Sequence, residues 1–251
     1  LGDSRATYQI CPEAVEAAMP ESKLDLVNLS MENGDSSAAL AVYRAYAHRF
    51  APRPLVLLCV SFWSINDGHP FEGGSELLAS LAFDDRWRLF GGKAACGSLF
   101  TPERSVLDDW MSIFAGAPRD IVGERGFRRL DAAFDGGTAP ARIEKEWLRI
   151  QRTWFADPVI DGIRWRQTVK DITTLHELGA QIVLIDAPFH PVLEQRLAGT
   201  PNGQLLRGFQ ENLDALAARL GIPVLQYTSA DMERENARAG ATLEMPTLDG
   251  H

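Results

Sequence analysis

Short apolar runs alternate along this chain with stretches of helical periodicity, and this alternation constrains the fold more than any other feature. Runs of strand length that alternate with helical patterns predict βαβ units and a parallel sheet covered by helices on both faces. We expect strands at residues 24–29, 55–61, 181–186 and 223–226. The predicted fold class is therefore α/β.

Helices are expected between these strands, at residues 12–18, 36–50, 163–178 and 205–220. Gly179 and Gly221 stand just past the last turn of two of them, a common way for a helix to end. A Gly-Asp-Ser turn opens the chain, and such a turn normally follows a strand. We therefore expect a further strand upstream of Leu1, at the centre of the sheet.

Composition narrows the class of protein. The chain has 251 residues, of which 45% are hydrophobic and 24% charged, as in folded globular domains. Its net charge of −9 would repel a phosphate backbone, so we expect no nucleic acid partner. No apolar run approaches the roughly 18 residues of a membrane span, and a signal or anchor would lie upstream of Leu1.

Of three cysteines, Cys59 is expected to be a buried thiol, whereas Cys11 and Cys96 could pair.

Residues 83–166 break the alternation, and glycine-rich stretches and tryptophans are concentrated there. We interpret this region as an insertion that forms a cap or lid within a single domain, residues 1–251. Its tryptophans could pack helices together or stack on sugar rings at the mouth of a site, and packing is the commoner role. These residues are Trp87, Trp110, Trp147, Trp154 and Trp165.

Polar blocks occur in the loops that follow predicted strands. They are GDS at residues 2–4, NLSMENG at 28–34, SIND at 64–67, and DGH at 249–251 near the end. In an open parallel sheet these loops gather at the carboxyl edge, where ligands bind. The blocks are therefore expected to share one site.

In this order, the blocks resemble those of the SGNH/GDSL hydrolase superfamily. The resemblance implies a three-layer α/β/α sandwich of flavodoxin-like organisation that needs no cofactor. It also implies that Ser4 is the nucleophile, that His251 is the base and that Asp249 orients His251. The backbone amides of Ser4 and Gly34 and the side-chain amide of Asn66 would form the oxyanion hole.

Two departures from the family pattern concern the third and fourth blocks. Ser64 stands where the family usually has glycine, and the final pair is Asp-x-His instead of Asp-x-x-His. Asp3, Asp67 and His69 are candidate supporting residues, and His69 is the rival base.

Simpler readings of the same blocks stay open. Asp3 or Ser4 could cap a helix, and residues 66–68 could form a plain turn. No spacing of histidine, cysteine or carboxylate residues in the sequence supports a metal site.

The stretch from residue 28 to residue 61 most resembles the branch of the superfamily tied to exported polysaccharides. That resemblance implies an acylated carbohydrate as substrate, acetyl transfer or ester hydrolysis as reaction, and a periplasmic or extracellular location. A lipase or small-ester esterase is the alternative enzyme. A module that keeps the fold and binds glycans without catalysis is the alternative from another class.

Overall fold

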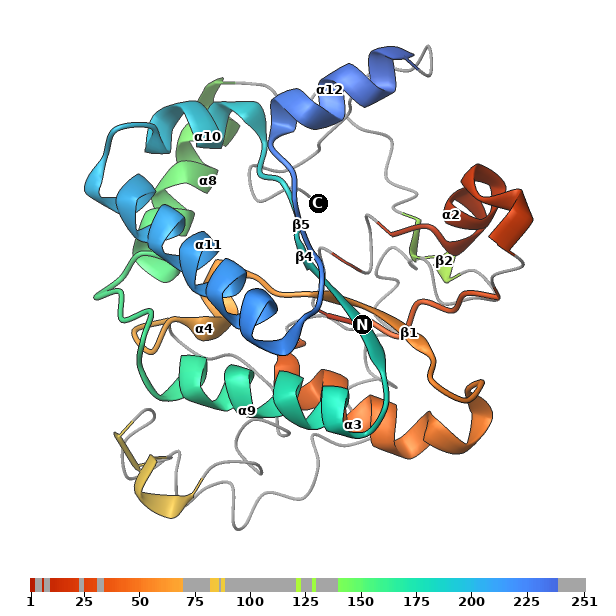
Figure 1. Cartoon of the computed structure of the whole chain (residues 1–251). Coiled ribbons are helices and arrows are strands. Elements are labelled where there is room, and N and C mark those ends of the chain that lie inside the picture. The colour runs from red at the N-terminus through yellow and green to blue at the C-terminus, as the bar shows by residue number, and fades with distance from the viewer. Residues whose placement is uncertain are drawn as a thin grey trace, which may run out of the picture.

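A small parallel sheet organises the protein (Figure 1). The computed structural model describes residues 1–2, 6, 10–22, 25–30, 34–69, 82–85, 87–88, 121–122, 128–129 and 140–238. The sheet contains β1 (Leu55–Cys59), β4 (Gln181–Asp186) and β5 (Val224–Gln226), in the order β1-β4-β5. Both pairs are parallel, and Cys59 is aligned with Ile185. The protein is thus a mixed α/β fold.

Three long helices pack together beside this sheet: α3 (Ser36–Tyr46), α9 (Ile163–Glu177) and α11 (Pro201–Leu220). Helix α9 lies between β1 and β4 in the chain, and α11 lies between β4 and β5. Because both crossovers step in the same direction, their usual right-handedness places the two helices on one face of the sheet. Helix α9 contacts both α3 and α11 (Figure 1).

The core lies between these helices and alternate residues of the strands. Leu58 of β1 and Leu184 of β4 are buried against it, as are Ile172 of α9 and Leu213 of α11. Ile150, in α8 (Pro140–Thr153), is also fully buried in the same cluster. Residues near the end of the predicted insertion therefore contribute to the core.

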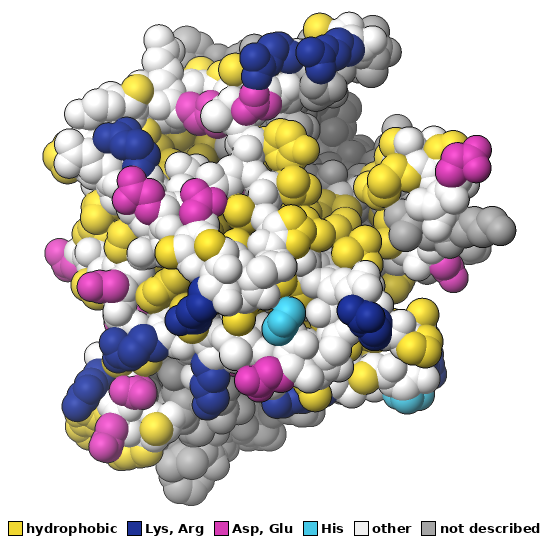
Figure 2. Space-filling view, in the orientation of Figure 1, with side chains coloured by type: hydrophobic (Ala, Val, Ile, Leu, Met, Phe, Trp, Pro, Cys, Tyr) yellow, Lys and Arg dark blue, Asp and Glu magenta, His cyan; other side chains and the backbone are white. Residues whose placement is uncertain are grey.

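The opposite face of the sheet is less covered. Leu55 and Leu225 remain 39% exposed, and Figure 2 shows hydrophobic side chains gathered over the sheet between α11 and α2 (Pro12–Ala18). Parallel sheets are normally buried on both faces, so the described residues cover this sheet unevenly.

Shorter elements complete the described structure. They are η1 (Pro20–Ser22), η2 (Ala47–Arg49), α4 (Phe62–Ile65), the antiparallel pair β2 (Ile121–Val122) and β3 (Arg128–Arg129), α10 (Pro191–Leu197) and α12 (Ser229–Arg238). In the described part of the chain no helix is both long and apolar enough to cross a membrane.

The expected strand at residues 24–29 is wrong: residues 25–30 form no strand. The side chain of Asn28 donates hydrogen bonds to the main-chain oxygens of Ala6 and Ile10, both 2.9 Å away. Side-chain hydrogen bonds thus hold this segment, whereas the sequence pattern predicted backbone pairing with another strand. Val27, an apolar residue of the expected strand, is 49% exposed.

The other expected strands and helices are present with small shifts. Helix α11 begins four residues earlier than expected, because Thr200 caps its first turn and Pro201 starts it. Gly221 ends it with φ of 65°. Cys11 is a free thiol, and Cys96 lies outside the described residues.

The tryptophans of the predicted insertion differ in their surroundings. Trp154 is buried in the core, and Trp147 and Trp165 pack against it. Trp87 is 51% exposed, and Trp110 lies outside the described residues. Packing is therefore the role of three of these five side chains.

Candidate active site

The Gly-Asp-Ser block begins at the carboxyl end of β1. Leu1 donates a hydrogen bond from its amino group to the oxygen of Leu57 (2.8 Å) and accepts one from the amide of Cys59 (2.9 Å). This is the pattern of a parallel bridge, in which one residue bonds to both neighbours of its partner. Leu1 thus lies beside β1, and the block follows directly.

Gly2 needs to be glycine at this position. Its φ is +142°, and a Cβ there would lie 2.8 Å from the Cβ of Cys59. Ala6 packs with Cys59 and with Ala187, which follows β4. Ala6 therefore lies near the ends of β1 and β4. Asp3 and Ser4, the predicted supporting residue and nucleophile, lie outside the described residues.

The second block is bonded to residues just past the first. Through Asn28, its first residue, it bonds to the oxygens of Ala6 and Ile10, and Asn28 is 7% exposed. The Asn28 carboxamide oxygen also accepts from the amide of Ser30. The second block is thus joined to residues that follow the first block in the chain.

Gly34, the predicted oxyanion donor of the second block, is buried directly before α3. Asp35 caps α3 by accepting a 2.9 Å hydrogen bond from the amide of Ala38. Residues 34–36 form a second Gly-Asp-Ser triplet, but Ser36 is buried and donates to Asp171 of α9 (2.9 Å). This second triplet is therefore a helix start, and its serine is held in the interior.

Asn66, the predicted side-chain donor of the third block, is completely buried. It donates a hydrogen bond to the oxygen of Trp154 (2.8 Å), and its own oxygen accepts from the amides of Gly68 (3.0 Å) and Val159 (2.8 Å). These bonds fasten the loop after α4 to the segment between α8 and α9. An oxyanion role for Asn66 would use the second hydrogen of its amide group.

Asp67, a predicted supporting residue, holds the start of α9. Its two carboxylate oxygens accept from the amides of Ile163 (2.7 Å) and Arg164 (2.8 Å). An acceptor for these amides is needed because the first amides of a helix have no partner within it. The position of Asp67 is thus explained by helix capping.

His69, the predicted rival base, contacts Trp63, with ring centroids 5.3 Å apart. Its main-chain oxygen accepts a hydrogen bond from the guanidinium of Arg164 (3.0 Å). His69 therefore lies in the same loop as Asn66, just past the third block. Helix α9 contacts this loop through the hydrogen bond from Arg164.

A buried polar cluster joins α3 to α9 beneath these loops. Asp171 accepts from Ser36, from Ser37 (2.6 Å) and from Gln167 (2.7 Å). Burial raises the pKa of Asp35 to about 6, and the nearby Asp171 adds to this. The Oδ2 atom of Asp35 is buried without a hydrogen-bond partner among the described residues.

This cluster was not predicted from the sequence. The signal was present, because Thr168, Asp171 and Leu175 follow Arg164 at the spacing of one buried helix face. Polar residues on such a face mark a buried polar contact instead of a solvated surface. Only the partner helix could not be read from this spacing.

His190 follows β4 at the same edge of the sheet and caps α10. Its Nδ1 atom accepts a hydrogen bond from the amide of Val192 (3.1 Å). An accepting nitrogen carries no proton, so the neutral ring has its proton on Nε2. Burial lowers the pKa of His190, which favours this neutral form, although Glu194 opposes the shift.

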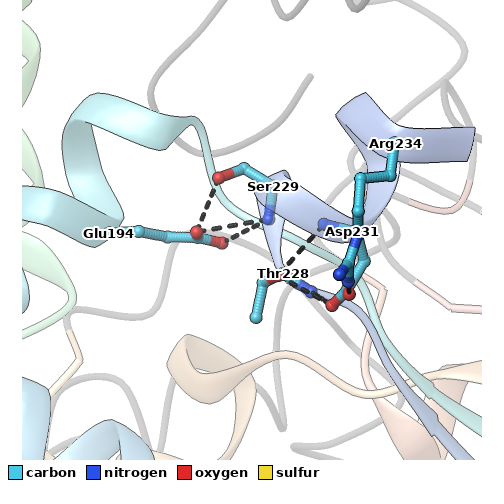
Figure 3. A network of polar contacts seen from close by, with 5 residues as sticks. All are labelled: Glu194, Thr228, Ser229, Asp231 and Arg234. Carbon is cyan, nitrogen blue, oxygen red and sulfur yellow. Dashed lines mark hydrogen bonds and ion pairs between the residues drawn. The ribbon is translucent and has the colours of Figure 1, made fainter. Parts of the chain in front are cut away.

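The segment that leads to the fourth block starts from a well-bonded junction (Figure 3). Glu194 of α10 accepts from the amide of Ser229 (2.9 Å) and from its hydroxyl (2.6 Å) at the start of α12. Asp231 accepts from the amide and hydroxyl of Thr228 and contacts Arg234. Asp249 and His251, the predicted orienting residue and base, lie outside the described residues.

In the described part of the chain, no group of three or more histidine, cysteine or carboxylate residues is placed to hold a metal ion. Comparisons of this chain with protein-family models, with curated proteins and with solved structures find no match. The function is therefore inferred from the chain's own residues and their positions.

Proposed function

We propose that this protein is a serine-dependent acyl ester hydrolase or O-acyltransferase of the SGNH type, which acts on an acylated carbohydrate. The single observation that carries the proposal is the bridge between Leu1 and β1, with Gly2 packed on Cys59. It supports a nucleophile at Ser4, because Gly2 lies at the carboxyl end of a parallel strand and Ser4 is only two residues further along the chain. Ligands of parallel sheets bind at this end of the strands.

The proposed reaction has two steps. The Ser4 oxygen attacks the ester carbonyl while His251, oriented by Asp249, accepts its proton. The amides of Ser4, Gly34 and Asn66 stabilise the negative charge on the carbonyl oxygen. His251 then protonates the leaving alcohol, and an acyl-serine remains until water or a sugar hydroxyl accepts the acyl group.

The arrangement of the described blocks agrees with this scheme at two points. Asn28 bonds the second block to Ala6, two residues past the first block, and Gly34 is buried just before Asp35, the cap of α3. The finer fold is also part of the proposal: a three-layer α/β/α sandwich in which the strand position occupied by Leu1 lies next to β1. An exported polysaccharide as substrate would imply a periplasmic or extracellular location.

A fluorophosphonate probe tests the proposal, because it forms a covalent adduct only with an activated serine. The protein is treated with the probe and weighed intact, beside Ser4→Ala and His251→Ala. Ser36→Ala is the matched control, since Ser36 belongs to the other Gly-Asp-Ser triplet but is bonded to Asp171. We expect one adduct on the wild type and on Ser36→Ala, and none on the other two variants.

Absence of an adduct on folded wild-type protein would overturn the catalytic proposal. Binding of acetylated glycans that survives in Ser4→Ala would then favour a non-catalytic glycan-binding module. If the adduct forms, turnover of acetylated oligosaccharide compared with p-nitrophenyl butyrate separates a carbohydrate esterase from a small-ester esterase.

A further inference from the structure

Arg164 lies where the second and third blocks meet. It is in the first turn of α9 and is 1% exposed, the largest fully buried side chain among the described residues. A buried guanidinium is costly unless charged and polar groups surround it. Its surroundings therefore indicate what this arginine holds in place.

The third block and the loop directly after it each contact Arg164. The guanidinium donates a 3.0 Å hydrogen bond to the oxygen of His69, and the Arg164 amide donates to Asp67 (2.8 Å). Asn66 lies directly before Asp67 and is fastened to the segment that enters α9. The loop with the predicted side-chain oxyanion donor thus depends on α9 and on this arginine.

Asp35 directly follows the second block, and its charge acts on Arg164. The two charges attract, as do those of Arg164 and Asp67, while burial lowers the pKa of Arg164 to about 10. Asp35 follows Gly34 and caps α3. The start of α3 is also hydrogen-bonded to α9, because Ser36 and Ser37 donate to Asp171 (2.9 and 2.6 Å). Helix α9, with Arg164 in its first turn, therefore supports the residues beside both predicted oxyanion donors.

We infer that Arg164 is a positioning residue that sets the spacing between the Gly34 backbone and the Asn66 loop, and so aligns the oxyanion hole. The inference rests on the proposed function. It goes beyond that function because Arg164 belongs to none of the four blocks and acts through Asp35, Asp67 and His69 without touching the substrate.

The alternative is that Arg164 only stabilises the fold, and the experiment is designed to separate the two roles. Removing a buried partner of a carboxylate is strongly destabilising, so Arg164→Met alone could fail to fold. Arg164→Lys keeps the charge but loses the planar donor group, and Asp35→Asn/Arg164→Met removes the unpaired carboxylate as well. Arg166→Met is the matched control, since Arg166 is exposed on the same helix.

The first readout is catalysis per active site, with p-nitrophenyl acetate as substrate and fluorophosphonate titration to count active sites. We expect Arg164→Lys to lower kcat about 10- to 100-fold with KM changed less than about threefold, because alignment acts on the transition state. Arg166→Met should match the wild type. A purely structural arginine would lower Tm and the number of active sites but leave kcat per site unchanged, and that result would overturn the inference.

The second readout needs no activity. Hydrogen exchange is followed by mass spectrometry in peptides that cover residues 34–38 and 66–69. We expect both to exchange at least about tenfold faster in Arg164→Lys and in the double variant, but not in Arg166→Met. Unchanged protection in both loops would refute the positioning role. Absence of a probe adduct on the wild type would refute the proposed function instead, so the two failures are distinct.

Discussion

At the scale of single residues, Asp35 makes the clearest prediction. Its carboxyl group has a pKa of about 6 in the folded protein and about 3.8 when exposed. The folded protein therefore binds this proton more tightly, and the free energy of unfolding should rise as the pH falls from above 6 to about 4. Two pKa units correspond to about 3 kcal/mol, the cost of keeping the charge buried above pH 7.

Asp35→Asn removes that cost and keeps the helix cap, because an asparagine oxygen also accepts from the Ala38 amide. We expect the variant to gain up to about 3 kcal/mol over the wild type at pH 8 and much less at pH 4.5. Urea unfolding at both pH values measures this. An equal gain at both would show that the effect does not come from ionisation.

Single residues also show how far the sequence predicts the site. The types of Asn66 and Asp67 and their place after a strand were enough to predict a loop at the sheet edge. Their partners were not predictable, because Trp154 and Ile163 lie far along the chain and meet them only through the fold. Arg164 was missed for the same reason, since nothing in the sequence around it shows that its charge interacts with that of Asp35.

At the scale of elements, the predictable ones are those whose local signals agree with their packing. The residues of β4 form an apolar run and lie between two other strands, so the predicted and observed bounds coincide. Residues 24–29 have a similar apolar pattern but no strand forms there, and Asn28 bonds across to Ala6 instead. Local pattern predicts a strand only where a neighbour supplies the backbone partners.

The stability of α12 is expected to depend on the Glu194 carboxylate, which bonds to the first residue of this helix. Ser229 is 4% exposed, and both its amide and its hydroxyl bond to Glu194 (Figure 3). Glu194→Ala leaves these two donors without that acceptor, so we expect a loss of about 2 kcal/mol. Amides of α12 should exchange faster, whereas those of β1 and β4 should not.

Glu211→Ala is the control for this change, because Glu211 is exposed on α11. Hydrogen exchange on both variants gives the comparison. If α12 keeps its protection in Glu194→Ala, the bonds to Ser229 do not determine where the helix begins.

At the scale of the whole molecule, one hydrophobic core runs through most of the described structure. It includes Leu40 of α3, Ile150 of α8 and Ala217 of α11 in a single cluster. The sequence predicted one domain in which residues 83–166, including Ile150, form an inserted cap or lid. Periodicity showed that this segment is helical and could not show which surface its apolar face covers.

A shared core predicts that α8 unfolds together with the sheet. Ile150→Ala should lower the free energy of unfolding by about 3 kcal/mol, because it leaves a cavity in the fully buried cluster. Urea unfolding is followed by tryptophan fluorescence, which includes the buried Trp154, and by far-ultraviolet circular dichroism. The two transitions should coincide and shift equally, as in a two-state domain. A shift confined to fluorescence would contradict the shared core and make α8 a unit that unfolds independently of the sheet.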